Sequence, residues 1–268
     1  MILIATSGYA YKDWKGPFYP KDIKDKDMLS FYSRFFPFTE INSSYYSMPN
    51  SYMFYHMMRK TPNDFLFSVK AYGGMTHQKD LSDTIVNKFT DALKPLIEQN
   101  RLCCVLFQFP YSFHNNQANK DYLKRVREHL KDVNIAVEFR SLDWLTEETI
   151  NLLKKCELSF VCVDEPPLKG LLPPVVAVTG PIGYIRFHGR NTEKWYNHQK
   201  SYERYDYLYS EEELKEWVPR IEHPAKKVKT VFIAMNNHFN AQAVINAQQL
   251  LNLIEKKNKN SRILRDDL

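Results

Sequence analysis

Short apolar segments typical of buried strands alternate with amphipathic segments typical of helices along almost the whole chain. The predicted strands are residues 2–7, 38–42, 65–70, 103–109, 135–139, 160–164, 183–188 and 231–236. The predicted helices are residues 27–36, 50–59, 82–99, 120–130, 146–156, 211–221 and 241–254. Eight strands with intervening helices predict an α/β fold, a single-domain TIM-like (β/α)₈ barrel over residues 1–255, followed by a basic C-terminal tail at 256–268.

A doubly wound parallel sheet is the alternative for such an alternation. Its usual phosphate signature is a glycine-rich turn after the first strand, and Thr6-Ser7-Gly8-Tyr9 holds only one glycine. The connection after the sixth strand also breaks the rhythm, because residues 165–181 contain five prolines. We expect that segment to form a loop or a short helix.

The cysteines and the N-terminus indicate where a chain like this works. Cys103, Cys104, Cys156 and Cys162 form no CxxC pair, and three of them lie in apolar segments, which is typical of buried reduced thiols. Residues 1–6 resemble a first strand rather than a signal peptide, and no apolar run approaches the roughly 20 residues that span a bilayer. The sequence therefore predicts a cytoplasmic protein with no membrane partner, and it leaves the oligomeric state open.

Polar side chains gather near the carboxyl ends of the predicted strands. If the more apolar face of each strand packs against helices, the alternation of side chains turns the other face into the barrel. A buried polar residue destabilises a packed barrel unless it is paired, and the active sites of such barrels lie at this end. We therefore expect a ligand-binding or catalytic site there, with a self-contained polar network as the alternative. The inward polar positions are Ser7, Glu40, Asn42, Ser68, Lys70, Gln108, Glu138, Arg140, Asp164, Arg186 and His188, followed after the eighth strand by Asn236, Asn237 and His238.

Charge and aromatic residues add to this expectation. Arg186 and His188 share one face of the seventh strand, and Arg190 follows it. The formal net charge of +6 is compatible with an anionic ligand or with nucleic acid. The segment 191–210 is long enough to cover the opening of the barrel at the carboxyl ends of its strands, which we call the mouth. Aromatic rings that could stack on a base or sugar, or simply cover the barrel, are Tyr9, Tyr11, Trp14, Tyr45, Tyr46, Trp144, Trp195, Tyr196, Tyr205 and Tyr207.

Short motifs lie at or just after most of the predicted strands. They are Thr6-Ser7-Gly8-Tyr9 with Trp14-Lys15-Gly16, Glu40-Ile41-Asn42, Phe67-Ser68-Val69-Lys70 with His77, Gln108-Phe109-Pro110, Glu138-Phe139-Arg140 with Trp144, Arg186-Phe187-His188-Gly189-Arg190-Asn191 with Trp195, and Asn236-Asn237-His238. In this order they resemble the DUF72 (YecE-like) family over nearly the whole chain. The resemblance implies a TIM barrel and supplies no reaction. The likeness of such barrels to endonuclease IV-type and sugar-isomerase barrels suggests a nucleic-acid or phosphosugar ligand, by analogy of fold alone.

The residue types at the mouth favour metal-independent acid–base chemistry on a small anionic, phosphate-bearing ligand such as a phosphosugar or a nucleotide, without a cofactor. Arginine suits such a ligand because its planar fork binds phosphate through two bonds. The expected catalytic residues are Glu40, Glu138, Asp164 and His188, with Glu138 or Glu40 as general acid or base and His188 or His238 as its partner. The expected ligand-binding residues are Asn42, Lys70, His77, Gln108, Arg140, Arg186, Arg190, Asn191, Trp195, Asn236, Asn237 and His238.

Other interpretations of the same residues remain open. A purely structural one pairs Glu138 with Arg186 and Asp164 with Arg140. A nucleic-acid binding or processing protein would use the basic balance and the rim aromatics, although no nucleic-acid motif is present. A non-catalytic scaffold is the remaining general alternative. The narrower chemical alternatives are a metal-dependent hydrolase or isomerase with Glu40, Glu138, Asp164, His188 and His238 as ligands, a Schiff base on Lys70, and a Glu40/Glu138 glycosidase pair.

Overall fold

Eight parallel strands form the centre of the computed structural model, which describes the backbone of residues 1–200 and 202–266 and side chains as far as residue 257. The hydrogen-bonded order is β1-β8-β7-β6-β5-β4-β3-β2, which wraps the strands into a nearly closed ring. The predicted TIM-like barrel is therefore confirmed over the doubly wound sheet. The strands are β1 (Ile2–Thr6), β2 (Phe38–Ile41), β3 (Leu66–Lys70), β4 (Leu102–Gln108), β5 (Ile135–Glu138), β6 (Leu158–Asp164), β7 (Gly183–Phe187) and β8 (Val231–Met235).

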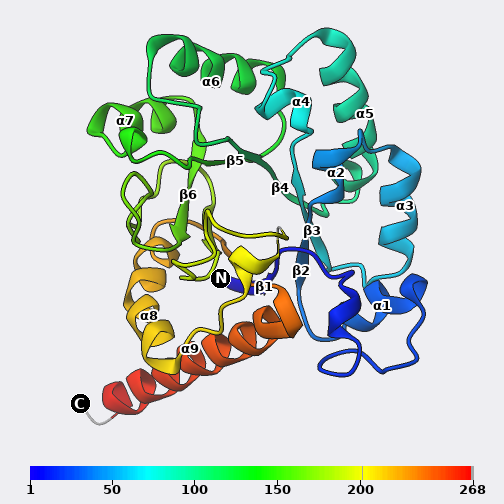
Figure 1. Cartoon of the computed structure of the whole chain (residues 1–268), viewed down its shortest axis with the longest axis vertical. Helices are drawn as coiled ribbons and strands as arrows, with labels where there is room; N and C mark the ends of the chain where they lie inside the picture. Colours follow the sequence, from blue (N-terminus) through cyan, green and yellow to red (C-terminus); the bar gives the residue numbers. More distant parts are fainter. Residues whose placement is uncertain (201, 267–268) are drawn as a thin grey trace.

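Helices surround this ring (Figure 1). Those that match predicted segments are α1 (Met28–Tyr32), α3 (Ser51–Arg59), α5 (Asp83–Glu98), α6 (Gln117–His129), α7 (Glu147–Lys155), α8 (Glu211–Ala225) and α9 (Gln242–Asp266). Helix α1 ends four residues before its predicted end, whereas α9 continues through most of the segment expected as a basic tail, whose residues 267–268 lie outside the described part. None of the helices within the described ranges combines the length and apolarity needed to cross a membrane.

Local sequence explains where several helices begin. Asn50, Asn116 and Thr146 each accept a backbone N–H of the first turn of α3, α6 and α7. Ser210 and Glu213 form a capping box at the start of α8, in which each side chain bonds the backbone of the other. These caps satisfy backbone donors that the helix itself leaves unpaired.

The short elements were not predicted. α2 (Ser43–Tyr46) and α4 (Gly73–Thr76) follow β2 and β3 and are one turn long, too short for a helical period to show in the sequence. The structure describes the whole of the proline-rich segment 165–181, and it contains no helix. Of the two forms expected for it, a loop or a short helix, the loop is therefore confirmed.

Strand β7 shows how alternation places the site. Ile185 and Phe187 face the surrounding helices, and the Phe187 ring lies 5.0 Å from the ring of Trp217 on α8. Tyr184 and Arg186 belong to the opposite face, which points into the barrel. Both are almost fully buried, so the polar end of Arg186 needs partners from other strands.

One seam of the barrel is closed by side chains. Within the described residues no hydrogen-bonded register joins β1 to β2, the two ends of the strand order. The buried Tyr32 of α1 bridges them, because its hydroxyl accepts the Thr6 N–H at 3.0 Å and donates to the Phe38 carbonyl at 3.2 Å. Ser7 and Glu40 form a second bridge, with 2.8 Å between Ser7 Oγ and Glu40 Oε1.

Replacing Tyr32 with phenylalanine is expected to lower the free energy of unfolding by about 1–2 kcal/mol, because it leaves a buried N–H and carbonyl without their partner. Urea denaturation measures the change. The matched control is Tyr52→Phe, because Tyr52 is 69% exposed, and it should change stability by less than about 0.5 kcal/mol. Equal stability of the two variants would show that the seam does not depend on the Tyr32 hydroxyl.

Candidate active site

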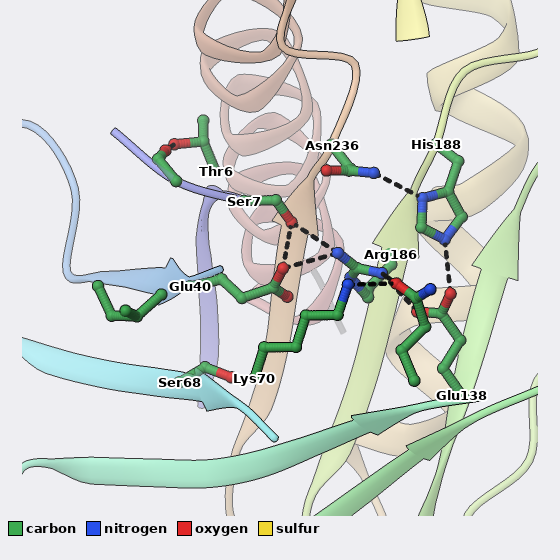
Figure 2. A network of polar contacts seen from close by, with 12 residues as sticks. Thr6, Ser7, Glu40, Ser68, Lys70, Glu138, Arg186, His188 and Asn236 are labelled. Atoms are coloured by element: carbon green, nitrogen blue, oxygen red, sulfur yellow. Dashed lines mark hydrogen bonds and ion pairs between the residues drawn. The ribbon is translucent and has the colours of Figure 1, made fainter. Parts of the chain in front are cut away.

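Arg186 lies at the centre of the barrel mouth between two buried glutamates from β2 and β5 (Figure 2). Its Nη2 atom donates to Glu40 Oε1 at 2.6 Å, and its Nη1 atom donates to Glu138 Oε2 at 2.6 Å. The same two nitrogens also reach Ser7 Oγ at 3.2 Å and Gln108 Oε1 at 3.3 Å. The structural pairing of Glu138 with Arg186 is therefore confirmed, and both acids share one guanidinium.

Glu138 is surrounded by further groups from neighbouring strands. Its Oε1 atom lies 2.9 Å from Arg140 Nη2 and 3.2 Å from His188 Nε2. Burial acts to raise the pKa of Glu138, but the guanidinium groups of Arg186 and Arg140 outweigh it and hold the pKa well below its ordinary value. Glu138 is therefore ionised at neutral pH.

Glu40 has partners on both carboxylate oxygens. Besides Arg186 and Ser7 on Oε1, the Tyr184 hydroxyl donates to Oε2 at 2.9 Å. Because one guanidinium stands between Glu40 and Glu138, the pair lacks the open gap in which a glycosidase holds its sugar.

His188 is a neutral side chain that the barrel fully buries. The Asn236 amide N–H donates to Nδ1 at 2.9 Å, so the ring proton sits on Nε2, which faces Glu138. Burial, together with the nearby charge of Arg140, lowers the pKa of His188 to about 3. At neutral pH His188 is therefore uncharged and has a single ring N–H, on Nε2, that a ligand could receive.

Lys70, at the carboxyl end of β3, has no acid within ion-pair distance among the described residues. Its Nζ atom donates to Gln108 Oε1 at 3.0 Å and lies 4.6 Å from the centre of the Tyr45 ring. Burial and the charge of Arg186 lower the pKa of Lys70 to about 8. His77 is an exposed neighbour whose ring lies edge-on to Tyr45 at 5.1 Å.

The ion pairs continue to an acid that the sequence reasoning missed. Arg140 Nη1 donates to Glu165 Oε2 at 3.0 Å, and the Leu172 N–H bonds Glu165 Oε1 at 3.1 Å. Glu165 is 5% exposed, and its burial raises its pKa to about 7 against the opposing charge of Arg140. One signal in the sequence could have identified Glu165 as a site residue. It is an acid that directly follows Asp164, the last residue of the sixth predicted strand.

Asp164 lies elsewhere, and its expected orientation and pairing were wrong. It stands beside Phe187 in the β6–β7 register and shares that residue's outward direction, so it does not face Glu138 across the mouth. Its partner is Arg190, with 2.9 Å from Nε to Oδ1 and 2.7 Å from Nη2 to Oδ2, and not Arg140. Tyr209 and Trp217 complete its environment, with donor distances of 2.7 and 2.6 Å.

Other expected ligand-binding residues hold the rim together. Asn191 bonds the carbonyl groups of Glu203 and Asp206, and Asn237 bonds the Tyr207 carbonyl at 2.9 Å. These contacts hold parts of the ranges 191–200 and 202–210, which Figure 1 shows in yellow across the middle of the ring of strands.

Aromatic rings of that segment cover His188. Trp195 is 3% exposed, and its ring and that of Tyr205 each lie 6.4 Å from the imidazole of His188. His238 stacks on Tyr11 at 4.4 Å, and burial lowers the pKa of His238 to about 4. The rim aromatics therefore pack against the mouth histidines.

A cavity of about 300 Å³ opens beside the β1–β2 seam. Glu40, Asn42 and Tyr11 are among its lining residues. The buried amide oxygen of Asn42 has no hydrogen-bond partner among the described residues, so a polar group of a ligand or a water fits there.

The mouth mixes acids with cations rather than grouping metal ligands. Across residues 1–200 and 202–257, no three His, Cys, Asp or Glu side chains lie together in an arrangement that would hold a metal ion. Each of the two central acids, Glu40 and Glu138, is instead paired with Arg186.

The chain is similar to known proteins over nearly its whole length. The family model described as "Protein of unknown function DUF72" matches residues 3–266. The UPF0759 protein YunF of Bacillus subtilis (strain 168) is 31% identical in an alignment 271 positions long, which covers 95% of each chain. A DUF72 family structure from Thermotoga maritima MSB8 is 40% identical with a TM-score of 0.88, covering 95% of this chain and 99% of that one. A second one, from Enterococcus faecalis V583, is 25% identical with a TM-score of 0.85, covering 95% and 96%.

Proposed function

The chain belongs to the DUF72 family, and we propose that its barrel mouth binds a small anionic, phosphate-bearing ligand and carries out metal-independent acid–base chemistry on it. Lys70 carries this proposal. Arg186 and Arg140 are each shared between two carboxylates, whereas the Lys70 ammonium has an amide oxygen as its hydrogen-bond acceptor and no ion-paired acid among the described residues. An anion would supply the missing charge at a site that stands at the catalytic end of a TIM-like barrel.

Buried donors without partners support the same proposal. Within the described residues, Arg186 Nε has no hydrogen-bond partner. His188 Nε2 lies 3.2 Å from Glu138 Oε1 but outside hydrogen-bonding geometry. A buried donor left unpaired costs about 1–3 kcal/mol, which a ligand oxygen or a water would recover.

The pKa values of Glu138, His188 and Lys70 change the chemical roles expected for these residues. Glu138 is held ionised and His188 is held neutral, so neither has a proton to release near neutral pH. Lys70, with a pKa lowered to about 8, is suited to exchange a proton there. We therefore assign proton transfer to Lys70, hydrogen-bond donation to His188, and the orientation of Arg186 to Glu40 and Glu138.

A Lys70→Met variant is expected to bind inorganic phosphate about 10- to 100-fold more weakly at pH 7, because it loses a charge-assisted hydrogen bond. Isothermal titration calorimetry measures the affinity. The control is Lys88→Met, which removes the same charge from the exposed face of α5. The proposal fails if Lys70→Met keeps the parent affinity or if Lys88→Met loses as much.

The pH profile gives a second readout of that variant. With inorganic sulfate, whose charge is constant from about pH 6 to pH 10, the parent affinity should be level below about pH 8 and fall above it as Lys70 loses its proton. Lys70→Met should show no such fall. A profile that is unchanged by the substitution would assign the titration to another group.

A further inference from the structure

The cavity beside the β1–β2 seam, which we call the seam cavity, is reached from solvent. Its volume of about 300 Å³ is at the lower end of the range for small-molecule pockets, so it suits a single ring system. Several residues that line it have solvent-exposed surface. Ala10 and Ser43 are exposed, and Tyr9, Asn42 and Met53 are half-buried.

The walls of the seam cavity are largely aromatic and apolar. Tyr9 and Tyr11 come from the loop after β1, and Met53 and Met57 come from α3. The Tyr11 ring is held in place because it stacks on the His238 imidazole, with 4.4 Å between the ring centres and 7° between the planes. Tyrosine rings and methionine thioethers both make favourable contacts with aromatic rings. The walls are therefore suited to a flat ring.

The Asn42 amide is a polar group of the lining that lacks a partner. Asn42 stands at the N-cap position of α2, where an asparagine side chain usually accepts a backbone N–H, but it makes no such bond. Its buried oxygen has no hydrogen-bond partner among the described residues. A buried acceptor without a donor destabilises the protein, and a ligand N–H would supply the donor.

An amide side chain is complementary to one edge of adenine. That edge places the exocyclic N–H, a donor, beside a ring nitrogen, an acceptor, and an asparagine can pair with both. Glu40 also lines the cavity, but its side chain is fully buried and is paired with Arg186 and Ser7. The cavity therefore offers an uncharged polar group to a ligand, which favours a neutral ring over an ionic one.

The seam cavity lies next to Lys70. Ile41 of β2 is paired with Val69 of β3. Asn42 and Lys70 directly follow this pair in the chain. Ser44 joins the two strand ends, because its Oγ atom lies 3.0 Å from the Ile41 carbonyl and 2.6 Å from the Lys70 carbonyl. A ring in the cavity and a phosphate at Lys70 can therefore belong to one small ligand.

We propose that the seam cavity holds the base of an adenine nucleotide. The Asn42 amide pairs with the edge of the base, and the tyrosines and methionines contact its ring. This inference rests on the proposed function for the phosphate, which Lys70 receives. The site for the base depends only on the cavity and on Asn42, so it is tested separately.

Adenosine 5′-monophosphate (AMP) and ribose 5-phosphate test this proposal, because they share the sugar phosphate and differ in the base. We expect the parent protein to bind AMP about 10-fold more tightly than ribose 5-phosphate by isothermal titration calorimetry. Asn42→Leu should weaken AMP binding about fivefold or more and leave ribose 5-phosphate within about twofold, because leucine cannot pair with the base. The control Asn87→Leu, at an exposed position of α5, should keep both affinities.

A cavity-filling variant leaves Asn42 in place. Ala10→Trp, at an exposed residue of the lining, should occupy the space and remove the preference for AMP, while the affinity for ribose 5-phosphate stays within about threefold of the parent. Its control is Ala118→Trp, at an exposed position of α6, which should keep the preference. Equal affinity of the parent for the two probes, or a preference for AMP that persists in both Asn42→Leu and Ala10→Trp, would overturn the proposal.

Adenosine distinguishes the two sites because it has no phosphate. It should bind the parent and Lys70→Met equally and should not bind Ala10→Trp, whereas Lys70→Met should weaken AMP and ribose 5-phosphate by the same factor. If adenosine behaves in this way but Lys70→Met leaves both phosphates unaffected, the proposed function fails and the site for the base stands. If Lys70→Met weakens both phosphates but adenosine does not bind the parent, the site for the base fails and the proposed function stands.

Discussion

An Arg186→Met variant is expected to lose about 3–5 kcal/mol in its free energy of unfolding, because the substitution leaves two buried carboxylates without their shared cation. Glu40 and Glu138 are both fully buried, and each lies 2.6 Å from a nitrogen of Arg186. Arg140 remains beside Glu138 and limits the damage on that side. Chemical denaturation at neutral pH measures the loss.

Lowering the pH should reduce the difference in stability between Arg186→Met and the parent protein. Without Arg186, the buried Glu138 carboxylate loses the largest of the charges that hold its pKa low, so its pKa in the folded variant rises and its protonated form is favoured. Stability contributed by such groups is lost as pH rises, and the deficit of the variant should therefore shrink as pH is lowered toward about 4. Adding Glu40→Gln and Glu138→Gln to the variant should recover stability at neutral pH for the same reason.

The control for this prediction is Arg34→Met, at an exposed position after α1. It should change stability by less than about 0.5 kcal/mol. If Arg186→Met is no less stable than Arg34→Met, the central guanidinium does not hold the mouth together. Arg186 would then also not be the residue that positions the groups around Lys70 and His188.

The strand alternation explains which parts of the mouth were predictable. In β7, Arg186 alternates with Ile185 and Phe187, so period two separates a polar inner face from an apolar outer one. In β6, each face is apolar except for one polar residue, Ser159 on one face and Asp164 on the other, and every residue is buried, so the pattern of the strand carries no sign of which face points inward. The orientation of Asp164 could therefore be read only from its register with Phe187.

Side-chain partners beyond the strand ends were less predictable for a different reason. Arg140 reaches Glu165, and Arg190 reaches Asp164 and Glu213, over separations of 25, 26 and 23 residues, which no local pattern records. A long arginine side chain can select among several acids, and the choice depends on how neighbouring strands and loops are stacked. The sequence thus indicated a charged mouth but not which charges neutralise each other.

That distinction bears on function. A cation whose charge is already shared between acids acts as a frame, and a cation without an acidic partner is available to a ligand. Arg186 and Arg140 belong to the first kind, and Lys70 belongs to the second among the described residues. The mouth therefore combines arginines that are already paired with acids and one ammonium, that of Lys70, which under the proposed function receives the anion.

An Asp164→Asn variant is expected to lose about 2–3 kcal/mol in stability, because one amide oxygen replaces a carboxylate that serves four donor atoms. Those atoms are Arg190 Nε and Nη2, the Tyr209 hydroxyl and Trp217 Nε1. The amide group would also direct its own donors at these donors. Urea denaturation measures the loss, and Glu216→Gln is its control, because Glu216 is 53% exposed and lies 3.5 Å from Arg190 Nη2. That control should lose less than about 1 kcal/mol.

Phosphate binding by the same variant separates the two roles that Asp164 has been given. If Asp164 positions β6, Arg190 and α8, the affinity of the folded variant for inorganic phosphate should stay within about threefold of the parent, because its donors lie outside the central mouth. If Asp164 instead faces the ligand as a catalytic residue, as the sequence suggested, the loss should approach that of Lys70→Met, about 10- to 100-fold. The outward orientation of Asp164 requires that Asp164→Asn lowers stability and leaves the affinity for inorganic phosphate nearly unchanged. A large loss of phosphate affinity in the folded variant would show instead that Asp164 belongs to the ligand site.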